Sequence, residues 1–382
     1  MILPSRGPAA SVASHLIDAT MFWNPSGGVR RYIVAKRAWL ARHSNWRHTL
    51  ATPRPDVADA ISVPSWPLPG SSGAYRLPWR RAAAAKVLCR ARPDLIEAGD
   101  PYRLAWSVLD AAAELGVPAV AFCHSNLERM AALATNSPRW RALAMRAARR
   151  YARRLYSRFD LVLAPSAAMR DHLVDWGVTA AQVQPLGVDT RLFCPRPIDP
   201  DWRRRLGLPA DARLAVFAGR FAPEKNLPTL VAAVERLGPP YWLVAVGAGP
   251  APPRGDRVRV LSALHQPETL ARLYSSADVF VHAGDQETFG LAALEALACG
   301  LPVVARAAEG LAELVDASVG ASVLHGTSEA FAEAIEAVAA RDPARLREAA
   351  RSHALAHDWD RVLPQLFERY RTLLTARPSH LP

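Results

Sequence analysis

Short apolar segments alternate with longer amphipathic segments along most of this chain of 382 residues. The short segments have the length and composition of strands, and the longer ones carry apolar residues at helical spacing. This alternation predicts an α/β fold built on parallel sheets. In chain order, the expected strands are His15–Ala19, Asp94–Ala98, Ala119–Cys123, Leu161–Pro165, Leu214–Gly219, Trp242–Gly247, Val258–Leu261, Val279–His282 and Val303–Ala305.

One stretch interrupts the alternation near the middle of the chain. Phe193–Asp201 contains three prolines, and we place a domain junction there. We therefore expect an N-terminal domain over residues 1–192 and a C-terminal domain over residues 193–358. The segment His43–Trp79 is rich in proline, serine and glycine, which predicts one or two strands and a loop.

Charge is distributed unevenly between these halves. Residues 1–192 carry 26 lysines and arginines against 13 acidic residues, whereas the rest of the chain carries 21 against 22. Such a basic half predicts an anionic partner. Eight of its arginines lie in Pro138–Asp160, whose apolar positions form a helical stripe that either packs on the domain or faces a lipid surface. The stripe consists of Trp140, Leu143, Ala147, Tyr151 and Leu155.

The cysteines and the apolar runs bear on the cellular compartment. Four cysteines are scattered without a close pair, which indicates buried thiols in a reducing environment. The N-terminus has no hydrophobic signal core, and no apolar run reaches 18 residues. We expect a cytoplasmic protein, with peripheral attachment to the inner face of the cytoplasmic membrane as the alternative.

The richest chemical pattern runs from Glu287 to Ala305. A helix is expected to begin near Gly290, after a Phe-Gly-Leu step, and to end at Gly300. The first free N–H groups of this helix, expected on Phe289, Gly290 and Leu291, would form an anion site. Glu287 then lies in the loop before the helix and Glu295 about one and a half turns inside it. The two carboxylates can therefore contact groups on opposite sides of a bound diphosphate.

Two cations follow a predicted strand in the same half of the chain. Arg220 and Lys225 come directly after Leu214–Gly219, at the strand's carboxyl end, where open α/β sheets bind ligands. Their charges can neutralise a diphosphate. Asn226 is expected to cap the following helix, with Pro228 in its first turn.

The N-terminal half contributes weaker signals. Gly27 and Gly28 open its first helix and permit close approach to a ligand, and Arg30 and Arg31 follow with positive charge. His124 follows the strand Ala119–Cys123 and precedes a polar pair, so we interpret it as facing a cleft rather than as a structural histidine.

These motifs resemble glycosyltransferase family 4, the retaining GT-B glycosyltransferases of glycosyl transferases group 1. The segment Glu287–Glu295 resembles that family's Glu-x7-Glu motif, in which the first glutamate contacts the donor sugar and the second holds the ribose hydroxyls. Gly219 to Asn226 matches the family's Gly-Arg and Lys-Asn pattern, and a histidine at the position of His124 lies beside the anomeric carbon. The turn Val246–Pro250 is similar to the family's Gly-x-Gly-Pro, but Leu261–Leu264 departs from its base-binding loop and leaves the base open.

The resemblance implies a GT-B fold, in which two Rossmann-like domains face each other across a cleft. It implies that the C-terminal domain binds a nucleotide-diphosphate sugar and that a final helix over residues 359–378 packs back on the N-terminal domain. His124, Arg220, Lys225 and Glu287 become the catalytic residues. The donor-binding residues become Gly27, Gly28, Arg220, Lys225, Phe289, Gly290, Leu291 and Glu295.

The reaction expected from this resemblance is metal-independent transfer of a hexose to a hydroxyl acceptor, with retention and without a cofactor. The basic half favours a lipid or lipid-linked glycan as acceptor, and no nucleic acid is expected because aromatic residues for base stacking are not interleaved. Two Asp-x-Asp sequences, Asp199–Asp201 and Asp358–Asp360, are interpreted as turn or cap residues rather than a metal motif. Alternatives are a sugar-nucleotide epimerase, an inverting GT-B transferase, or a non-catalytic basic protein that binds membrane or nucleic acid.

Overall fold

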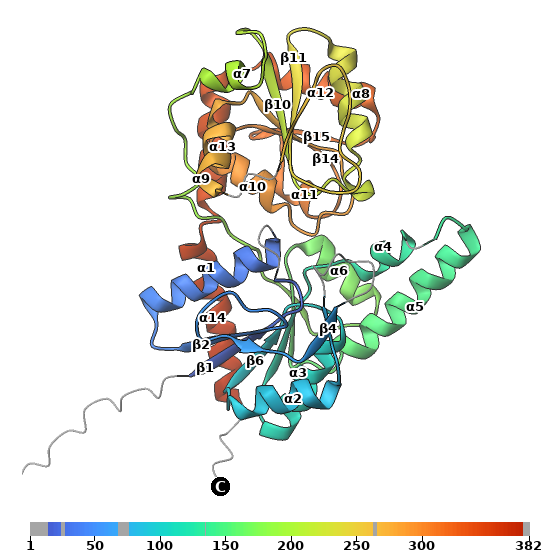
Figure 1. Cartoon of the computed structure of the whole chain (residues 1–382), viewed down its shortest axis with the longest axis vertical. Helices are drawn as coiled ribbons and strands as arrows, with labels where there is room; N and C mark the ends of the chain where they lie inside the picture. The colour runs from blue at the N-terminus through green and yellow to red at the C-terminus, as the bar shows by residue number, and fades with distance from the viewer. Residues whose placement is uncertain (1–13, 24–26, 68–75, 134, 263–265, 377–382) are drawn as a thin grey trace, which may run out of the picture.

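The computed structural model describes residues 14–23, 27–67, 76–133, 135–262 and 266–376. Within these residues the chain forms two α/β lobes, which lie one above the other in Figure 1. Each lobe is built on a parallel sheet flanked by helices, as the alternation of segments predicts. All nine expected strands are present, and their bounds agree with the prediction to within one residue at either end.

The first lobe contains a seven-stranded sheet of order β3-β2-β1-β6-β7-β8-β9, paired in parallel throughout. Its strands are β1 (His15–Ala19), β2 (Arg47–Thr52), β3 (Ile61–Ser62), β6 (Leu95–Ala98), β7 (Ala119–Phe122), β8 (Leu161–Ala164) and β9 (Ala181–Val183). The strands β4 (Ser65–Pro67) and β5 (Arg76–Pro78) form a separate antiparallel pair. The helices are α1 (Gly28–His43), α2 (Arg81–Arg90), α3 (Arg103–Leu115), α4 (Leu127–Ala132), α5 (Pro138–Tyr156) and α6 (Ala167–Asp175).

The second lobe contains a six-stranded parallel sheet of order β12-β11-β10-β13-β14-β15. Its strands are β10 (Arg213–Ala218), β11 (Tyr241–Val246), β12 (Val258–Leu261), β13 (Val279–His282), β14 (Val303–Arg306) and β15 (Gly320–Val323). Its helices are α7 (Asp201–Arg205), η1 (Pro223–Lys225), α8 (Leu227–Leu237), α9 (Pro267–Ser276), α10 (Leu291–Ala298), α11 (Glu309–Leu314), α12 (Ser328–Ala339) and α13 (Pro343–Leu355).

Each sheet has a point where the chain order reverses. In the first sheet β1 lies between β2 and β6, and in the second β10 lies between β11 and β13. Loops that leave the carboxyl ends of the two strands at such a point diverge and open a crevice that binds ligands. The loops after β10 and β13 contain Lys225 and Glu287, so the topology brings these two residues to one crevice.

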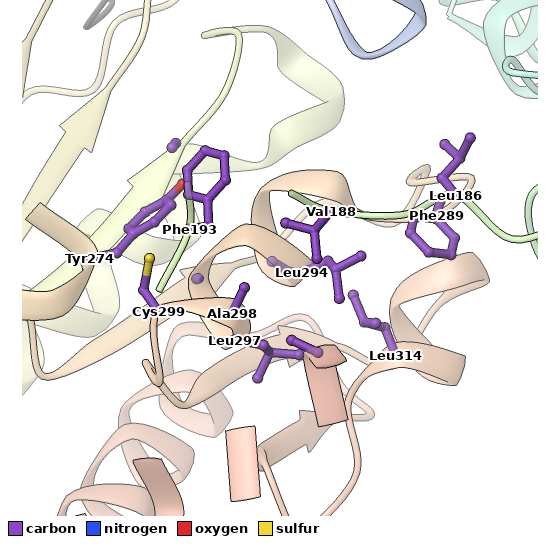
Figure 2. Packing of buried hydrophobic residues seen from close by; sticks show 14 of the residues in the cluster. Leu186, Val188, Phe193, Tyr274, Phe289, Leu294, Leu297, Ala298, Cys299 and Leu314 are labelled. Carbon is purple, nitrogen blue, oxygen red and sulfur yellow. The ribbon is translucent and has the colours of Figure 1, made fainter. Parts of the chain in front are cut away.

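The core reflects the alternation of side chains along each buried strand. Leu16 and Ile17 point to opposite faces of the first sheet, where they belong to different buried clusters. The cluster that contains Leu16 is continuous with one face of the second sheet. The linker between the lobes comprises residues 184–200, between β9 and α7. Figure 2 shows how the continuity arises: Val188 and Phe193 of this linker lie along α10 and α9 of the second lobe. The linker is therefore part of the packed interior.

The last helix, α14 (Trp359–Ala376), runs back along the first lobe, as the red helix of Figure 1 shows. Its buried face follows helical spacing, and Phe367 stacks on Trp39 of α1 with 5.0 Å between ring centroids. The Tyr370 hydroxyl donates to Glu97, whose carboxylate also accepts a hydrogen bond from Lys36 at 3.0 Å. A buried polar network thus fixes the final helix to the first sheet. The buried apolar residues of α14 are Trp359, Val362, Leu363, Leu366 and Phe367.

Candidate active site

Glu287 lies at the centre of a small polar cluster between β10 and β13. Its carboxylate forms an ion pair with Lys225, and the His282 Nε2 atom lies 3.2 Å from its Oε1. The amide of Gly284 donates to His282 Nδ1 at 3.2 Å, so Nδ1 is an acceptor and the ring's N–H, on Nε2, points to Glu287. Burial alone would raise the pKa of the Glu287 carboxyl, but the charge of Lys225 and the bond from His282 outweigh it and hold that pKa well below its usual range. Glu287 is therefore an ionised, oriented acceptor.

The two predicted cations occupy different positions in the crevice. Lys225 is largely buried against Glu287, whereas the Arg220 guanidinium is exposed and pairs with Glu224 at 2.7 Å. Arg220 is thus brought to the crevice but not into contact with Glu287. Asn226 precedes α8 as expected, but it adopts a left-handed conformation with φ of 49° and its side chain makes no capping bond. The predicted side-chain cap is wrong, because the tight turn of η1 fixes the backbone there instead.

Two glycine-containing loops meet beside these cations. A Cβ atom on Gly247 would lie 1.9 Å from the carbonyl oxygen of Gly219, and one on Gly249 would lie 2.3 Å from that of Phe221. The segment Val246–Pro250 therefore needs its glycines so that the loops after β10 and β11 can touch. Residues 263–265, which include two of the four residues of the predicted base-binding region, lie outside the described residues.

The helix that carries Glu295 begins one residue later than its pattern predicts. Gly290 is the N-cap of α10, with φ of 99°, and a Cβ atom there would lie 2.7 Å from Leu311 Cδ2. Glycine is thus required by both conformation and packing. Because the first residue of α10 is Leu291, the free amides belong to Leu291 and its successors rather than to Phe289. The Phe289 side chain is buried in the core, so the predicted role of this residue in anion binding would rest on its backbone amide alone.

The first lobe approaches this helix through its own glycine pair. Gly27 is the N-cap of α1, and a Cβ atom on Gly28 would lie 3.2 Å from Leu291 Cδ1. The N-termini of α1 and α10 therefore face the same gap between the lobes, and both present unpaired amide ends and positive dipoles. The preceding residues 24–26 lie outside the described part of the chain.

His124 reaches the same gap from the end of β7. Its carbonyl oxygen accepts a bond from the Thr288 hydroxyl at 3.1 Å, which places it beside the loop of Glu287. Its ring stacks on Phe122 with 4.3 Å between centroids, and within the described chain its buried Nε2 atom has no hydrogen-bond partner. Burial, aided by the charge of Lys36, lowers the pKa of His124 to about 3. The ring is therefore neutral at physiological pH, and its free nitrogen can form a hydrogen bond with a ligand.

Glu295 is buried beneath the start of α1, with 3% of its surface exposed. Its Oε1 atom accepts from Arg31, which reaches across from the first lobe, and its Oε2 atom is buried without a partner among the residues the structure describes. Arg31, Leu291 and Glu295 line a groove of about 370 Å³ between α1, the linker and α10. A smaller cavity of about 150 Å³ lies at the amino ends of β10 and β13, away from all of these side chains.

A second contact joins the lobes at the opposite rim of the gap. Glu313 of α11 accepts the amide hydrogens of Ala167 and Ala168 at 2.9 and 2.7 Å, so it caps the N-terminus of α6. Glu309 of the same helix pairs with His172 at 3.0 Å. Glu313, Glu309 and His172 carried no signal in the sequence, because their partners lie far away along the chain. His282 was missed for another reason: it lies at the end of an apolar strand, and the sequence does not show that its ring turns to Glu287. The two Asp-x-Asp sequences act as interpreted, since the first aspartate of each accepts the amide of the second.

Comparison with known proteins adds an independent line of support. Residues 26–192 match the model of Glycosyltransferase Family 4, and residues 198–353 match that of Glycosyl transferases group 1. A GDP-mannose-dependent alpha-(1-6)-phosphatidylinositol dimannoside mannosyltransferase of Mycobacterium tuberculosis is 32% identical over 315 residues, which is 79% of each chain. The chain belongs to glycosyltransferase family 4. A GDP-mannose-dependent alpha-mannosyltransferase of Mycolicibacterium smegmatis is also 32% identical, over 75% of each chain.

Solved structures support the fold of this family member. Sucrose-phosphate synthase from Thermosynechococcus elongatus superimposes with a TM-score of 0.78 at 24% identity, over 95% of this chain and 100% of that one. The Anabaena protein HepE, solved with UDP and glucose, gives 0.72 at 22% identity over 93% and 99%. The predicted GT-B fold is thereby confirmed, and the protein is a glycosyltransferase.

Proposed function

We propose that this glycosyltransferase is a metal-independent, retaining hexosyltransferase whose donor is GDP-mannose. The observation that carries the proposal is the pairing of Lys225 and His282 with Glu287 in the loop before α10, close to a Glu295 oxygen that has no partner in the part of the chain that the structure describes. Glu287 can accept hydrogen bonds from sugar hydroxyls, and the free oxygen of Glu295 can accept them from a ribose diol. The start of α10 lies between them and can bind the diphosphate. The GDP-mannose-dependent relatives favour the guanine nucleotide and the mannosyl group.

The residues have distinct roles in the proposed reaction. Lys225, Arg220 and the amides that begin α10 stabilise the charge that develops on the leaving diphosphate, so the chemistry needs no metal ion. Glu287 orients the sugar through its hydroxyls, because an ionised carboxylate paired with a lysine is a weak nucleophile. A phosphate oxygen takes the proton of the acceptor hydroxyl, which attacks from the face that the leaving group vacates. Neutral His124 contributes a hydrogen bond beside the reacting carbon.

The reaction can be tested without knowing the acceptor, because water can replace it slowly. GDP-mannose, UDP-glucose and ADP-glucose are incubated separately with the protein in EDTA, and the released sugar is followed by proton NMR. We expect release from GDP-mannose, with the α-anomer formed first, since the donor is α-linked. Release of the β-anomer first would contradict retention, and dependence on added Mg²⁺ or Mn²⁺ would contradict the metal-free mechanism. If sugar is released only from UDP-glucose or only from ADP-glucose, GDP-mannose is not the donor.

We further propose that the acceptor is a lipid or lipid-linked glycan and that the hairpin of α4 and α5 holds the protein on an anionic membrane. This hairpin projects from the first lobe (Figure 1). The apolar stripe of α5 packs on the lobe at one end only. Leu155 is buried in the lobe, but Trp140 and Leu143 are 65% and 55% exposed. Met130 and Leu133 of the α4 region are exposed nearby, and Arg139 and Arg141 flank Trp140. Exposed apolar residues between cations match the interface of an anionic bilayer.

Charge complementarity and the relatives agree on this acceptor class. Helix α5 carries seven arginines and no acidic residue, and only Arg149 among them pairs with an acid of the lobe in the described chain, namely Glu128 at 2.5 Å. Each free basic residue near an anionic surface contributes on the order of 1 kcal/mol. The mycobacterial relative is named for a phosphatidylinositol-based acceptor. No helix in the described residues is long and apolar enough to cross a bilayer.

Sedimentation with phosphatidylglycerol vesicles tests the membrane proposal. We expect the wild type to pellet at low salt and to be released at high salt, because salt screens charge. Arg139, Arg141, Arg146 and Arg150 changed together to Gln should abolish pelleting, whereas the matched change of Arg203, Arg204, Arg205 and Arg345 in the second lobe should not. A wild type that stays in the supernatant at low salt would refute the proposal, and pelleting on RNA instead would favour a nucleic-acid partner.

A further inference from the structure

We propose that Arg31 is a positioning residue for nucleoside binding, which holds the Glu295 carboxylate from the opposite lobe so that one oxygen stays free for the ribose hydroxyls. The inference rests on the proposed donor and goes beyond it, because it makes the donor site incomplete without the first lobe.

The geometry of the pair is asymmetric. Arg31 lies in the first turn of α1 and Glu295 in the second turn of α10, and they are 264 residues apart in the chain. The guanidinium donates to Oε1 alone. Oε2 is buried and, among the described residues, accepts nothing. Buried carboxylate oxygens are nearly always hydrogen-bonded, so a vacant one beside a groove indicates a ligand group that donates.

A vicinal diol is the donor that fits this oxygen. A ribose offers two neighbouring O–H groups, and a carboxylate oxygen has two lone pairs to accept them. The groove of about 370 Å³ runs past Glu295 between apolar Leu291, Pro267 and Val34, which can cover the sugar ring. Tyr274, on α9, places a buried hydroxyl in the same neighbourhood, and no partner for that hydroxyl exists in the described chain.

Arg31 also determines whether the carboxyl group is charged. Burial raises the pKa of Glu295, and the charge and hydrogen bond of Arg31 oppose that rise. The other titratable groups that act on this site are the Tyr274 hydroxyl from α9 and the Cys299 thiol from α10, both of which are neutral near pH 7 because burial raises their pKa. The remaining charged residues that line the groove are Arg42, Asp189, Arg191, Asp358 and Asp360. Without Arg31, little opposes the effect of burial, so the pKa of the Glu295 carboxyl should rise further.

Calorimetric titration with GDP and with 2′,3′-dideoxy-GDP tests the role of Arg31. We expect Arg31→Gln to weaken GDP binding about tenfold at pH 7, which corresponds to one charged hydrogen bond. Binding of the dideoxy analogue should be unchanged, because it lacks the diol. Arg31→Lys should recover most of the loss, and Arg37→Gln, on the same helix but bonded to the Ala58 carbonyl, should match the wild type.

The pH profile separates positioning from a structural role. In Arg31→Gln the deficit for GDP should shrink as the pH is raised, because the loss of Arg31 raises the pKa of Glu295 further and the carboxyl ionises and accepts again only at higher pH. A pH-independent deficit, an equal loss for both nucleotides, or wild-type affinity for GDP would each overturn the inference. If the wild type binds GDP and prefers it over its dideoxy analogue, the proposed function stands whatever Arg31 does. If the wild type binds neither GDP nor UDP, the proposed function and this inference fail together.

Discussion

The two lobes share one architecture but contribute to the site in different ways. The second lobe presents its chemistry at the ends of β10 and β13 and at the start of α10, in segments whose sequence spacing already indicates a ligand. The first lobe contributes single residues that contact the second lobe, such as Arg31 on Glu295 and the His124 carbonyl on Thr288. In the proposed function the second lobe therefore binds the donor, and the first lobe completes the site. The first lobe also carries the basic surface, so its role toward an acceptor differs from that of its partner.

The largest expected effect concerns the packing that makes α14 part of the first lobe. Phe367 is 1% exposed and stacks on Trp39, so Phe367→Ala should lower the free energy of unfolding by ~3–5 kcal/mol. Urea denaturation followed by circular dichroism measures this change. Val174→Ala, at an exposed position of the same lobe, should change stability by less than about 0.5 kcal/mol. Equal effects for both variants would show that α14 does not stabilise the first lobe.

Lys225→Ala tests whether this lysine of the second lobe stabilises the transition state or only binds the nucleotide. The ammonium stabilises charge that develops on the diphosphate, so turnover of GDP-mannose should fall about 10²–10³-fold while GDP affinity falls much less. Steady-state rates and calorimetry on the same preparation provide both values. The control is Lys86→Ala, an exposed lysine of the first lobe. A loss of affinity as large as the loss of turnover would reduce Lys225 to a binding residue.

Glu295→Ala should affect binding rather than chemistry. Loss of the charged acceptor for the ribose should weaken GDP by ~1.5–3 kcal/mol, which calorimetry measures directly. The matched variant Glu333→Ala removes an exposed glutamate from the same lobe and should have no effect. If GDP affinity is unchanged in Glu295→Ala, the buried carboxylate does not belong to the nucleotide site.

The smallest expected effect uses pH to examine the contribution of the first lobe. The pKa of His124 is lowered to about 3 from an ordinary 6.5, so the unfolded chain takes up a proton first as pH falls. The stability that this neutral ring contributes is present above pH 6.5 and is lost progressively below it. From pH 7 to pH 5 the wild type should lose about 1–2 kcal/mol more than His124→Gln. Glu97, whose pKa is raised to about 7, acts in the opposite direction in both proteins and cancels in the difference. Parallel pH profiles would show that His124 is solvated.

The strands could be predicted because each is a short apolar run whose side chains are buried on both faces of a parallel sheet. The segment His43–Trp79 could not be resolved in the same way. It holds four strands instead of the expected one or two. β2 is a full strand of six residues, but β3, β4 and β5 have only two or three residues each, and β4 and β5 contain prolines and pair apart from the main sheet. The edge strands β9 and β15 were missed for the same reason, since few of their residues need to be apolar.

The site shows a similar division between local and distant information. Glu287, Lys225 and Glu295 lie within motifs of a few residues, and the structure joins the first two in one ion pair. The partner of Glu295 could not be inferred, because Arg31 meets it only after two domains have folded and closed. His282 was assigned to a strand and given no chemistry, although its ring orients Glu287. A pair of residues from different domains, such as Arg31 and Glu295, has no characteristic spacing in the sequence by which it could be predicted.

Hydrogen exchange with and without GDP, read by mass spectrometry in EDTA, locates the nucleotide most directly. If the donor binds at the second lobe and the first lobe completes the site, GDP should protect the peptides that contain residues 219–226 and 284–298. Weaker protection is expected at the start of α1, around Arg31. Protection confined to the first lobe, or none at saturating GDP, would contradict the assignment of the donor site to the crevice after β10 and β13.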